Sequence, residues 1–426
     1  LIKKDGCVMI PKGHIKKDEE AKNAALREVK EELMLLENPE IIADIGYDQY
    51  AFYLDGDQRK HYKKVYLYAF RMKNKANIAP LEKEDFVEAK WFEFNEALSK
   101  ITFDRKNLLK ARQVYYLNKS VKTYKNLSDI KSLVVAMPVF NGSKTIINAL
   151  KSVLASFNEL PKSIACKIYI SFDHCTDNSE ELVKDFINKD KLENIVTLNN
   201  SGLKGKSTTL NKIVSNSLSD IICVVDDDVI LDKGCLIALI RELINHDGLR
   251  CVFARWIRAR YTNKNPWKKL LHWILGVKFD IQPFDQPSEM MRGSCMMLRR
   301  DDYVKFPDGI YNEDQFLQYM YWPHTKEVNE AFLYFNSVSN ITDYYKRFIR
   351  ITVGNRQLSD EFTQSRINDC NKDLYRKIDY NKIFKLPARQ YIPFLLYRFV
   401  RIFVNFIVKI RLSLNKNHEW FRIKQP

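Results

Sequence analysis

Glycine and proline are scarce in this sequence. Each occurs 13 times in 426 residues, which excludes a collagen-like or low-complexity chain. The eight cysteines form no Cys-x-x-Cys pair, and none stands with a histidine at zinc-site spacing. We therefore expect buried free thiols in a reducing compartment.

Long apolar runs are also missing. No stretch reaches the ~18 uncharged apolar residues that span a bilayer, and the N-terminus has no continuous apolar run. We therefore expect neither a spanning helix nor a signal peptide. Apolar residues still make up 46% of the chain and aromatic residues 12%. A large core and two or three domains are expected, which excludes general disorder.

The positive charge is unevenly distributed. The formal net charge is +16, yet residues 381–426 hold ten Lys or Arg and a single acid, Glu419. The excess therefore belongs largely to a C-terminal tail and not to a surface spread over the whole protein. This pattern favours phosphates or an anionic membrane as partners, and no nucleic acid.

Three zones and a linker divide the chain. Residues 1–118 mix short strands with one charged helix, and residues 119–130 are polar without periodicity, as in a linker. Residues 131–360 alternate apolar runs with helical patterns, and residues 361–426 form the basic tail. The alternation predicts a parallel sheet with crossover helices, whose ligand lies beyond the carboxyl ends of the strands. Strands are expected at 133–138, 167–172, 195–198 and 221–225, and helices at 145–154 and 179–187.

An acidic helix follows a glycine turn in the first zone. Glu28, Glu31 and Glu32 are spaced i, i+3 and i+4, so they share one helix face. Three carboxylates on one face repel each other unless a cation neutralises them, and oxygen ligands suit Mg²⁺ or Mn²⁺. The alternative is a solvated helix whose charge is balanced by Arg27 and Lys30.

The spacing of this segment resembles the Nudix box, and 89–98 resembles a late strand and helix of that fold. The resemblance implies an α/β/α sandwich that hydrolyses a nucleoside diphosphate linked to another group. It also implies that Glu28, Glu31 and Glu32 hold the metal and act in catalysis together with Arg27, which orients them. The residues that carry the resemblance are Gly13, Glu19, Arg27, Glu28, Val29, Glu31 and Glu32.

Two features depart from the Nudix pattern. Met34 replaces the last glycine of the box. A methionine there costs ~1 kcal/mol if the helix ends in a left-handed residue. A further strand is also expected before Leu1. Its absence indicates either a truncated sequence or an incomplete domain. The alternative to a hydrolase is a non-catalytic module that senses nucleotides or acts as a scaffold.

Three aspartates follow a buried strand in the second zone. In extended geometry Asp226 and Asp228 point to the same side. Such a pair can hold a divalent cation that also binds a diphosphate. The alternative is a solvated turn in which an aspartate acts as a cap.

Other motifs accompany these aspartates in a fixed order. Together they resemble a family 2 glycosyltransferase with the Rossmann-like GT-A fold. The resemblance implies inverting transfer of a hexosyl or N-acetylhexosaminyl group from a nucleotide sugar, most often UDP-linked, to an acceptor hydroxyl. The motifs are Pro138–Asn141, Asp173–Asp177, Gly205–Asn211, Asp226–Asp228, Gly293–Ser294 and Asn312–Asp314.

The resemblance also assigns roles. Asp173 would contact the nucleobase of the donor, Asp226 the nucleotide and Asp228 the metal. Asp314 would deprotonate the acceptor hydroxyl, although an acid pair at a helix N-terminus explains it equally without the other motifs. Lys206 lies in a loop expected to approach phosphates. A P-loop is excluded, because Asn200 occupies the position of its first glycine.

Three departures from the glycosyltransferase pattern are visible. Gly142 stands where an acid often follows the first motif, and His174-Cys175 replaces a Gly-Ser pair. The Gln-x-x-Arg-Trp motif of processive members becomes Arg347 to Ile351, in which only Arg350 is kept. An enzyme that adds a single sugar is therefore expected.

The tail contains a strongly amphipathic segment at 391–412. Its polar residues Arg398, Arg401, Asn405 and Lys409 form one stripe, and nearly all others are large and apolar. This pattern is typical of a helix in a membrane interface, and the alternative is a helix docked on the catalytic domain's own core. Residues 267–276 have a similar basic-aromatic character, which fits a core helix or a wall of the acceptor site.

These observations predict a cytoplasmic enzyme on the inner face of a membrane. Its donor is a nucleotide sugar, its acceptor a glycan or a lipid-linked molecule, and its cofactor Mg²⁺ or Mn²⁺. Its tail would contact anionic lipid.

Overall fold

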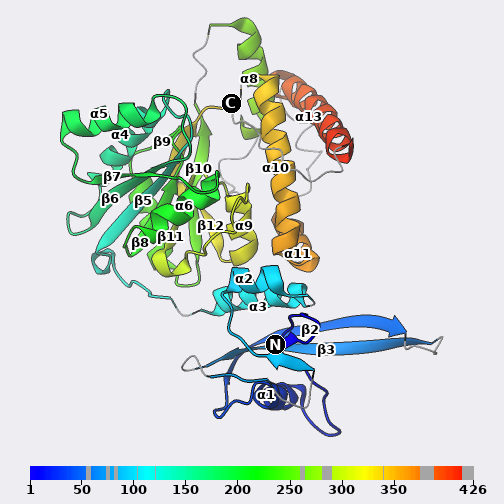
Figure 1. The fold of residues 1–426 in the computed structure, drawn as a ribbon. Helices are drawn as coiled ribbons and strands as arrows, with labels where there is room; N and C mark the ends of the chain where they lie inside the picture. Colours follow the sequence, from blue (N-terminus) through cyan, green and yellow to red (C-terminus); the bar gives the residue numbers. More distant parts are fainter. Residues whose placement is uncertain are drawn as a thin grey trace. The chain divides into compact units, whose positions relative to one another are not determined.

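The computed structural model describes residues 1–53, 59–72, 77–80, 85–102, 104–119, 121–259, 264–280, 290–338, 340–374 and 388–414. The chain divides into two compact units (Figure 1). Unit 1 comprises residues 1–120 with 361–363, and unit 2 comprises residues 121–360 with 364–426.

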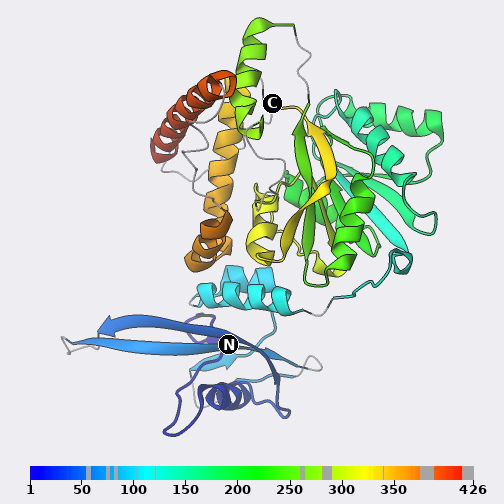
Figure 2. The ribbon, with the colours of Figure 1, turned by 180° about the vertical axis from the view of Figure 1, so that it is seen from behind.

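Unit 1 is an α/β sandwich built around a long hairpin. Strands β2 (Glu40–Tyr53) and β3 (Lys60–Arg71) pair antiparallel, and β1 (Ile2–Lys3) pairs with β4 (Phe86–Glu88). The hairpin lies between α1 (Ala21–Glu32) on one side and α2 (Phe94–Lys100) with α3 (Arg105–Asn118) on the other (Figures 1 and 2). The predicted Nudix-like layering is confirmed.

The end of α1 shows how the chain accommodates the missing glycine. Met34 adopts a left-handed conformation with φ of 49°. Its N–H donates to Glu31 O at 3.2 Å, and Leu35 N–H donates to Lys30 O at 3.0 Å. These two bonds are those of a Schellman motif, whose C′ residue is usually glycine. Met34 therefore keeps the helix exit of the box and bears its conformational cost.

Unit 2 is built on an eight-stranded sheet in the order β7-β6-β5-β8-β11-β10-β12-β9. The four predicted strands are present and run parallel. Beyond β8 the prediction of a parallel sheet is wrong, because β11 pairs antiparallel with both β8 and β10. Strands and helices continue to alternate after β8, and β10 pairs parallel with β12, so the alternation alone does not fix the direction of β11. The strands are β5 (Ser132–Val139), β6 (Ala165–Phe172), β7 (Ile195–Asn199), β8 (Ile221–Val225), β9 (Val229–Leu231), β10 (Cys251–Arg258), β11 (Cys295–Arg299) and β12 (Thr325–Phe335).

The helices of unit 2 fall into two groups. Those between the parallel strands are crossovers, and α4 and α5 begin within one residue of the predicted positions. The later helices include the acid-bearing α9 and the long α10 and α13. The helices are α4 (Ile146–Phe157), α5 (Ser179–Asp190), α6 (Lys206–Ser215), α7 (Cys235–Asn245), α8 (Pro266–Asp280), α9 (Glu313–Tyr321), α10 (Ile341–Glu361), α11 (Gln364–Leu374) and α13 (Ala388–Leu414), with short 3₁₀ turns at Leu127–Asp129 and Arg300–Asp302.

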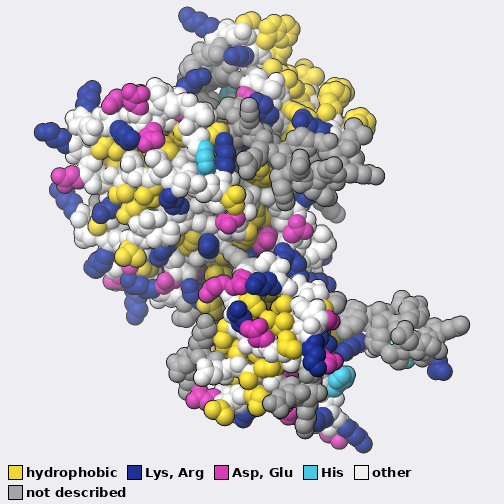
Figure 3. Space-filling view, viewed as in Figure 1, with side chains coloured by type: hydrophobic (Ala, Val, Ile, Leu, Met, Phe, Trp, Pro, Cys, Tyr) yellow, Lys and Arg dark blue, Asp and Glu magenta, His cyan; other side chains and the backbone are white. Residues whose placement is uncertain are grey.

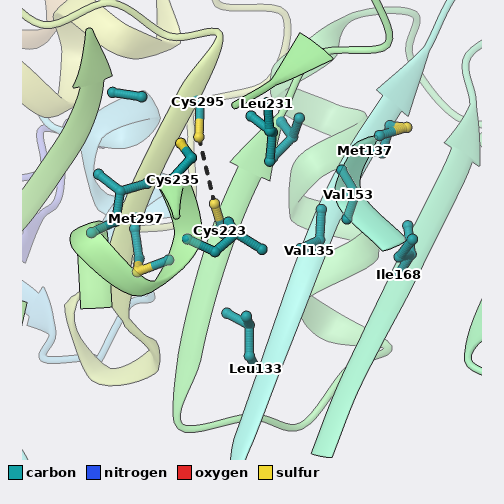
Figure 4. Packing of buried hydrophobic residues seen from close by; sticks show 14 of the residues in the cluster. Leu133, Val135, Met137, Val153, Ile168, Cys223, Leu231, Cys235, Cys295 and Met297 are labelled. Carbon is teal, nitrogen blue, oxygen red and sulfur yellow. Dashed lines mark hydrogen bonds between the residues drawn. The ribbon is translucent and has the colours of Figure 1, made fainter. Parts of the chain in front are cut away.

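The core of unit 2 lies between the sheet and its helices. Leu133, Val135 and Met137 alternate along β5 and are fully buried against one layer (Figure 4). Cys223 and Cys295 meet in the same core with their sulfurs 3.8 Å apart. All eight cysteines are free thiols, and five of them are buried. This rigid core fixes the strand ends that carry the polar motifs.

Candidate active site

The loops after β5 and β6 are tied together at the carboxyl edge of the sheet. Asn141 Oδ1 accepts the N–H of Thr176 at 2.8 Å, and Asp177 Oδ2 accepts the N–H of Ser143 at 3.0 Å. Asn141 itself has a φ of 54°, a conformation that asparagine tolerates better than most residues. The polar residues of the first two motifs therefore hold the two loops together at this edge of the sheet.

Asp173 is buried at the end of β6 and organises the next loop. Its Oδ2 accepts the N–H of Gly205 at 2.9 Å, and its Oδ1 accepts Nδ2 of Asn200 at 2.9 Å. His174 Nδ1 lies 3.1 Å from the same Oδ1. The carboxylate thus fixes the loop from which Lys206 projects at the start of α6.

Lys206 connects two groups of acids. Its Nζ lies 2.6 Å from Asp226 Oδ1 and 2.5 Å from Glu313 Oε1, and it donates to Gly293 O at 3.3 Å. Burial acts to lower the pKa of Lys206, but the charges of Asp226 and Glu313 outweigh it and raise the pKa. Lys206 is therefore a permanent cation at the centre of the site.

The aspartates after β8 crowd negative charge into a small space. Desolvation by the crowded surroundings, followed by the charge of Asp226, raises the pKa of Asp228 although part of its side chain is exposed, while Lys206 acts in the opposite direction. Burial and its two neighbours also raise the pKa of Asp227. Nothing in the described part of the chain donates to the buried Oδ2 of Asp227. The cluster therefore holds more carboxylates than Lys206 alone can offset.

Gly142 gives Asp227 its space. A Cβ at position 142 would stand 2.1 Å from Asp227 Oδ2, far inside any real contact. The Asp227 carboxylate therefore lies beside position 142, which carries no acid of its own in this chain. The departure from the glycosyltransferase pattern at Gly142 therefore leaves the space that the Asp227 carboxylate occupies.

Asp314 lies in the first turn of α9, and its charge acts on Arg347 together with those of Asp226 and Asp228. Its Oδ1 accepts the N–H of Gln315 at 2.8 Å and its Oδ2 the N–H of Gly293 at 3.2 Å. Burial, followed by the charge of Glu313, raises the pKa of Asp314 to about 6, against the effect of Lys206. The carboxylate is thus oriented by the backbone and close to the pKa of an effective base.

Arg347 on α10 is a further site residue whose role the sequence did not indicate. Burial and the neighbouring Arg350 lower its pKa, and three acids of the site act against this shift, namely Asp228, Asp314 and Asp226. The buried Nε of Arg350 has no hydrogen-bond partner among the described residues. The signal in the sequence is the spacing of Arg347 and Arg350, about one helical turn apart.

A divalent cation fits the aspartates after β8. Asp228 reaches solvent and stands next to Asp226 in a cluster with excess negative charge. In the described part of the chain, no three His, Cys, Asp or Glu side chains are grouped as a complete metal site. Mg²⁺ is commonly held by one or two carboxylates that are completed by substrate phosphates and water. The pair Asp226 and Asp228 matches that type of site.

The predicted residues of unit 1 form a separate polar cluster. Arg27 donates from Nε to Glu19 Oε1 at 2.9 Å and from Nη1 to Glu28 Oε1 at 2.7 Å, and Nη1 lies 3.5 Å from Glu31 Oε2. Arg27 lowers the pKa of Glu19 to about 2. The guanidinium therefore orients the acids of α1, as the resemblance implies.

Glu32 and Gly13 complete this cluster. Glu32 is buried, and its Oε2 accepts the N–H of Lys12 at 2.8 Å. A Cβ on Gly13 would stand 1.8 Å from Cδ of Glu28, so the Glu28 carboxylate occupies the space that glycine leaves open. The acids thus have protein partners already, and none of their described groupings is a complete metal site.

Family comparisons identify both parts of the chain. The NUDIX domain model matches residues 2–111, and the glycosyl transferase family 2 model matches residues 134–306. The two resemblances expected from the sequence are confirmed in the same order.

Individual relatives are distant. The chain is 26% identical over 136 residues to the probable glycosyltransferase YdaM of Bacillus subtilis (strain 168), and the match covers 32% of each protein. The chain thus matches about a third of that relative's length. TarS 1–349 of S. aureus is 13% identical with a TM-score of 0.37, over 68% of this chain and 93% of that one. The mannosyltransferase PcManGT of Pyrobaculum calidifontis, solved with GDP-Man and Mn²⁺, is 12% identical with a TM-score of 0.42, over 76% of this chain and 91% of that one.

Proposed function

Because the chain joins a NUDIX domain to a family 2 glycosyl transferase domain, we propose that unit 2 is a metal-dependent inverting glycosyltransferase. It moves one sugar from a nucleotide sugar to an acceptor hydroxyl, and the proposed donor is UDP-linked. The observation that carries this proposal is the position of Asp314. A backbone-oriented carboxylate with a pKa of about 6 accepts the N–H of Gly293, the carbonyl of Gly293 accepts Lys206, and Lys206 pairs with Asp226 after β8.

The chemistry follows from this arrangement. The acceptor hydroxyl attacks the anomeric carbon of the donor while the Asp314 carboxylate takes its proton. The bond from that carbon to the diphosphate oxygen breaks, and the nucleoside diphosphate leaves with the electron pair. Attack from the side opposite the leaving group inverts the anomeric centre, so one base is sufficient.

The remaining residues hold the donor. Asp173 and the loop it fixes would bind the nucleoside, and Asp226 would bind the nucleotide. Lys206 and Arg347 supply positive charge near the diphosphate. A divalent cation bound by Asp226 and Asp228 would neutralise charge on the leaving diphosphate.

A panel of UDP- and GDP-sugars, each assayed with and without glycan and lipid-linked acceptors, tests this proposal. Sugar transfer that requires Mg²⁺ or Mn²⁺ and is strongly reduced by Asp228→Ala supports it. Transfer that persists in EDTA at the full rate would contradict the metal assignment. Retention of the anomeric configuration in the product would contradict the single-base mechanism.

For unit 1 we propose hydrolysis of a nucleoside diphosphate derivative, with Glu28, Glu31 and Glu32 as ligands of Mg²⁺ or Mn²⁺. The network from Arg27 to Glu19 and Glu28 supports this proposal, because it preserves the acid geometry of the box. The alternative is a non-catalytic nucleotide-sensing or scaffold module. It is favoured by the acids' existing partners, Arg27 and the Lys12 backbone.

We also propose that the enzyme works in the cytoplasm, on the inner face of a membrane. The α13 helix of the tail would contact anionic lipid, and a lipid-linked or glycan acceptor would meet the site there.

A further inference from the structure

The α13 helix has two apolar faces. One packs within unit 2 against α8 and α10 in a cluster that includes Tyr397, Val404 and Val408. The sequence-based alternative of a helix docked on its own domain is therefore correct for this face. The partners are Ile274, Leu275 and Val277 of α8 and Tyr344 and Ile349 of α10.

The opposite face of α13 is exposed. Phe399 is 70% exposed, Ile402 64% and Phe406 61%. An 18-residue window within Gln390–Arg411 has a mean hydropathy of 1.6, and only 22% of it is buried. A helix that served only the core would not leave so much apolar surface in water. The other large apolar residues of this face are Ile392, Leu395, Leu396, Phe403 and Ile410.

The α8 helix extends this face. Trp267 is 74% exposed, and Leu270 and Trp273 are also exposed on the same helix. Because α8 packs directly on α13, the apolar side chains of both helices belong to one side of unit 2. Figure 3 shows hydrophobic side chains gathered over this region. We call these exposed residues of α8 and α13 the two-helix face.

The charges on the two helices are almost all of one sign. Residues 264–280 and 388–414 contain one acid, Asp280, the last residue of α8. The basic residues are Lys264, Lys268, Lys269 and Lys278 in the first range and Arg389, Arg398, Arg401, Lys409 and Arg411 in the second. Aromatic and aliphatic groups among cations match the headgroup region of an anionic bilayer.

Two other occupants fit less well. A second copy would bring one set of cations against the same set, and like charges at an interface are costly. By length and composition alone α13 could cross a bilayer, contrary to the expectation from the sequence. A spanning helix would be surrounded by lipid, whereas α13 has one face packed on α8 and α10 of unit 2. The charge and the burial together therefore favour a surface that lies on the membrane.

We propose that α8 and α13 form a composite docking surface for anionic bilayers, in which Trp267 and Trp273 anchor α8 at the interface. The surface deepens the proposed function, because it would hold the transferase site beside lipid-borne acceptors. Binding itself requires no catalysis. An Asp314→Asn variant is therefore expected to bind vesicles normally, so failure of one proposal is distinguishable from failure of the other.

Sedimentation of the full chain with vesicles tests this surface. Vesicles of phosphatidylcholine alone are compared with vesicles that contain phosphatidylserine. We expect wild-type protein to bind the anionic vesicles at least tenfold better. The double variants Trp267→Ser/Trp273→Ser and Phe399→Ser/Phe406→Ser should each weaken that binding about tenfold or more. The matched control is Leu218→Ser, which alters a 91% exposed apolar residue outside the two-helix face and should change nothing.

Four outcomes would overturn the proposal. The first two are equal binding of the wild type to both vesicle types and no binding of the wild type to either. The third is that the α13 variant loses binding while the α8 variant binds like wild type. The fourth is that bound protein resists extraction at high salt and alkaline pH. A wild-type dimer in solution that the α13 variant converts to monomer would assign the face to a second copy instead. Circular dichroism melting of each variant verifies that the substitutions, all of exposed side chains, leave the fold intact.

Discussion

The pH dependence of sugar transfer should change when Glu313 loses its charge. The pKa of Asp314 is raised from 3.8 to about 6, first by burial and then by the charge of Glu313. That is a shift of about two units, or ~3 kcal/mol in favour of the protonated form. Glu313 is the second cause that raises the pKa, so removal of its charge should lower the pKa of Asp314.

Asp314 must be ionised to accept a proton, so transfer should decline as the pH falls below about 6. In Glu313→Gln the acid limb should move to lower pH. The release of Lys206 from Glu313, to which it is now bound at 2.5 Å, would act in the same direction. The conservative Glu313→Asp change keeps the charge and serves as the control.

The assay is kcat/KM for transfer, measured from pH 5 to 9 at constant ionic strength and saturating metal, because this quantity reports groups of the free enzyme. An acid limb that stays in place in Glu313→Gln, or moves to higher pH, would refute the reasoning. A limb that is absent from the wild type would refute the assignment of Asp314 as the base.

Three other predictions concern separate features. Gly142→Ala should lower the free energy of unfolding of unit 2 by ~1–3 kcal/mol, because its Cβ would stand 2.1 Å from a carboxylate oxygen. Gly248→Ala, with open space around its Cβ, is the control in urea denaturation, and equal effects would contradict the packing argument. Met34→Gly should raise the free energy of unfolding of unit 1 by ~1 kcal/mol, because glycine relieves a residue at φ of 49°; a loss of stability would show that the Met34 side chain contributes more than its backbone costs. Glu31→Gln and Glu32→Gln should each abolish metal-dependent hydrolysis of nucleoside diphosphate derivatives, measured as formation of the nucleoside monophosphate, and leave sugar transfer unchanged. If the wild type hydrolyses nothing in a broad panel, unit 1 is the scaffold or sensor module.

The local elements of unit 2 were predictable because their signals are local. The strand at Ile221–Val225 is found as expected, and the other three parallel strands lie within two residues of the expected positions. Each is a short apolar run that ends at a polar motif. The antiparallel insertion of β11 was not predictable, since the order and direction of strands distant in the sequence depend on contacts that no local pattern contains.

The same limit applies to the site. The acids were recognised from their spacing and order, but the ion pairs of Lys206 join residues 226 and 313, far apart in the sequence. The position of Arg347 opposite the acids depends on where α10 packs. In α13 the stripe of basic residues was predicted from periodicity. That the helix has both a buried and an exposed apolar face could be seen only when its partners α8 and α10 were in place.

The central claim is that Asp314 is the base of an inverting sugar transfer. The most direct measurement compares Asp314→Asn with wild type for two quantities, the rate of transfer to acceptor and the affinity for the nucleotide-sugar donor in the presence of metal. We predict that transfer falls by a factor of 10² or more while donor affinity changes less than about threefold, because the amide keeps the shape of the carboxylate but accepts no proton. Transfer by Asp314→Asn at the wild-type rate would contradict the account.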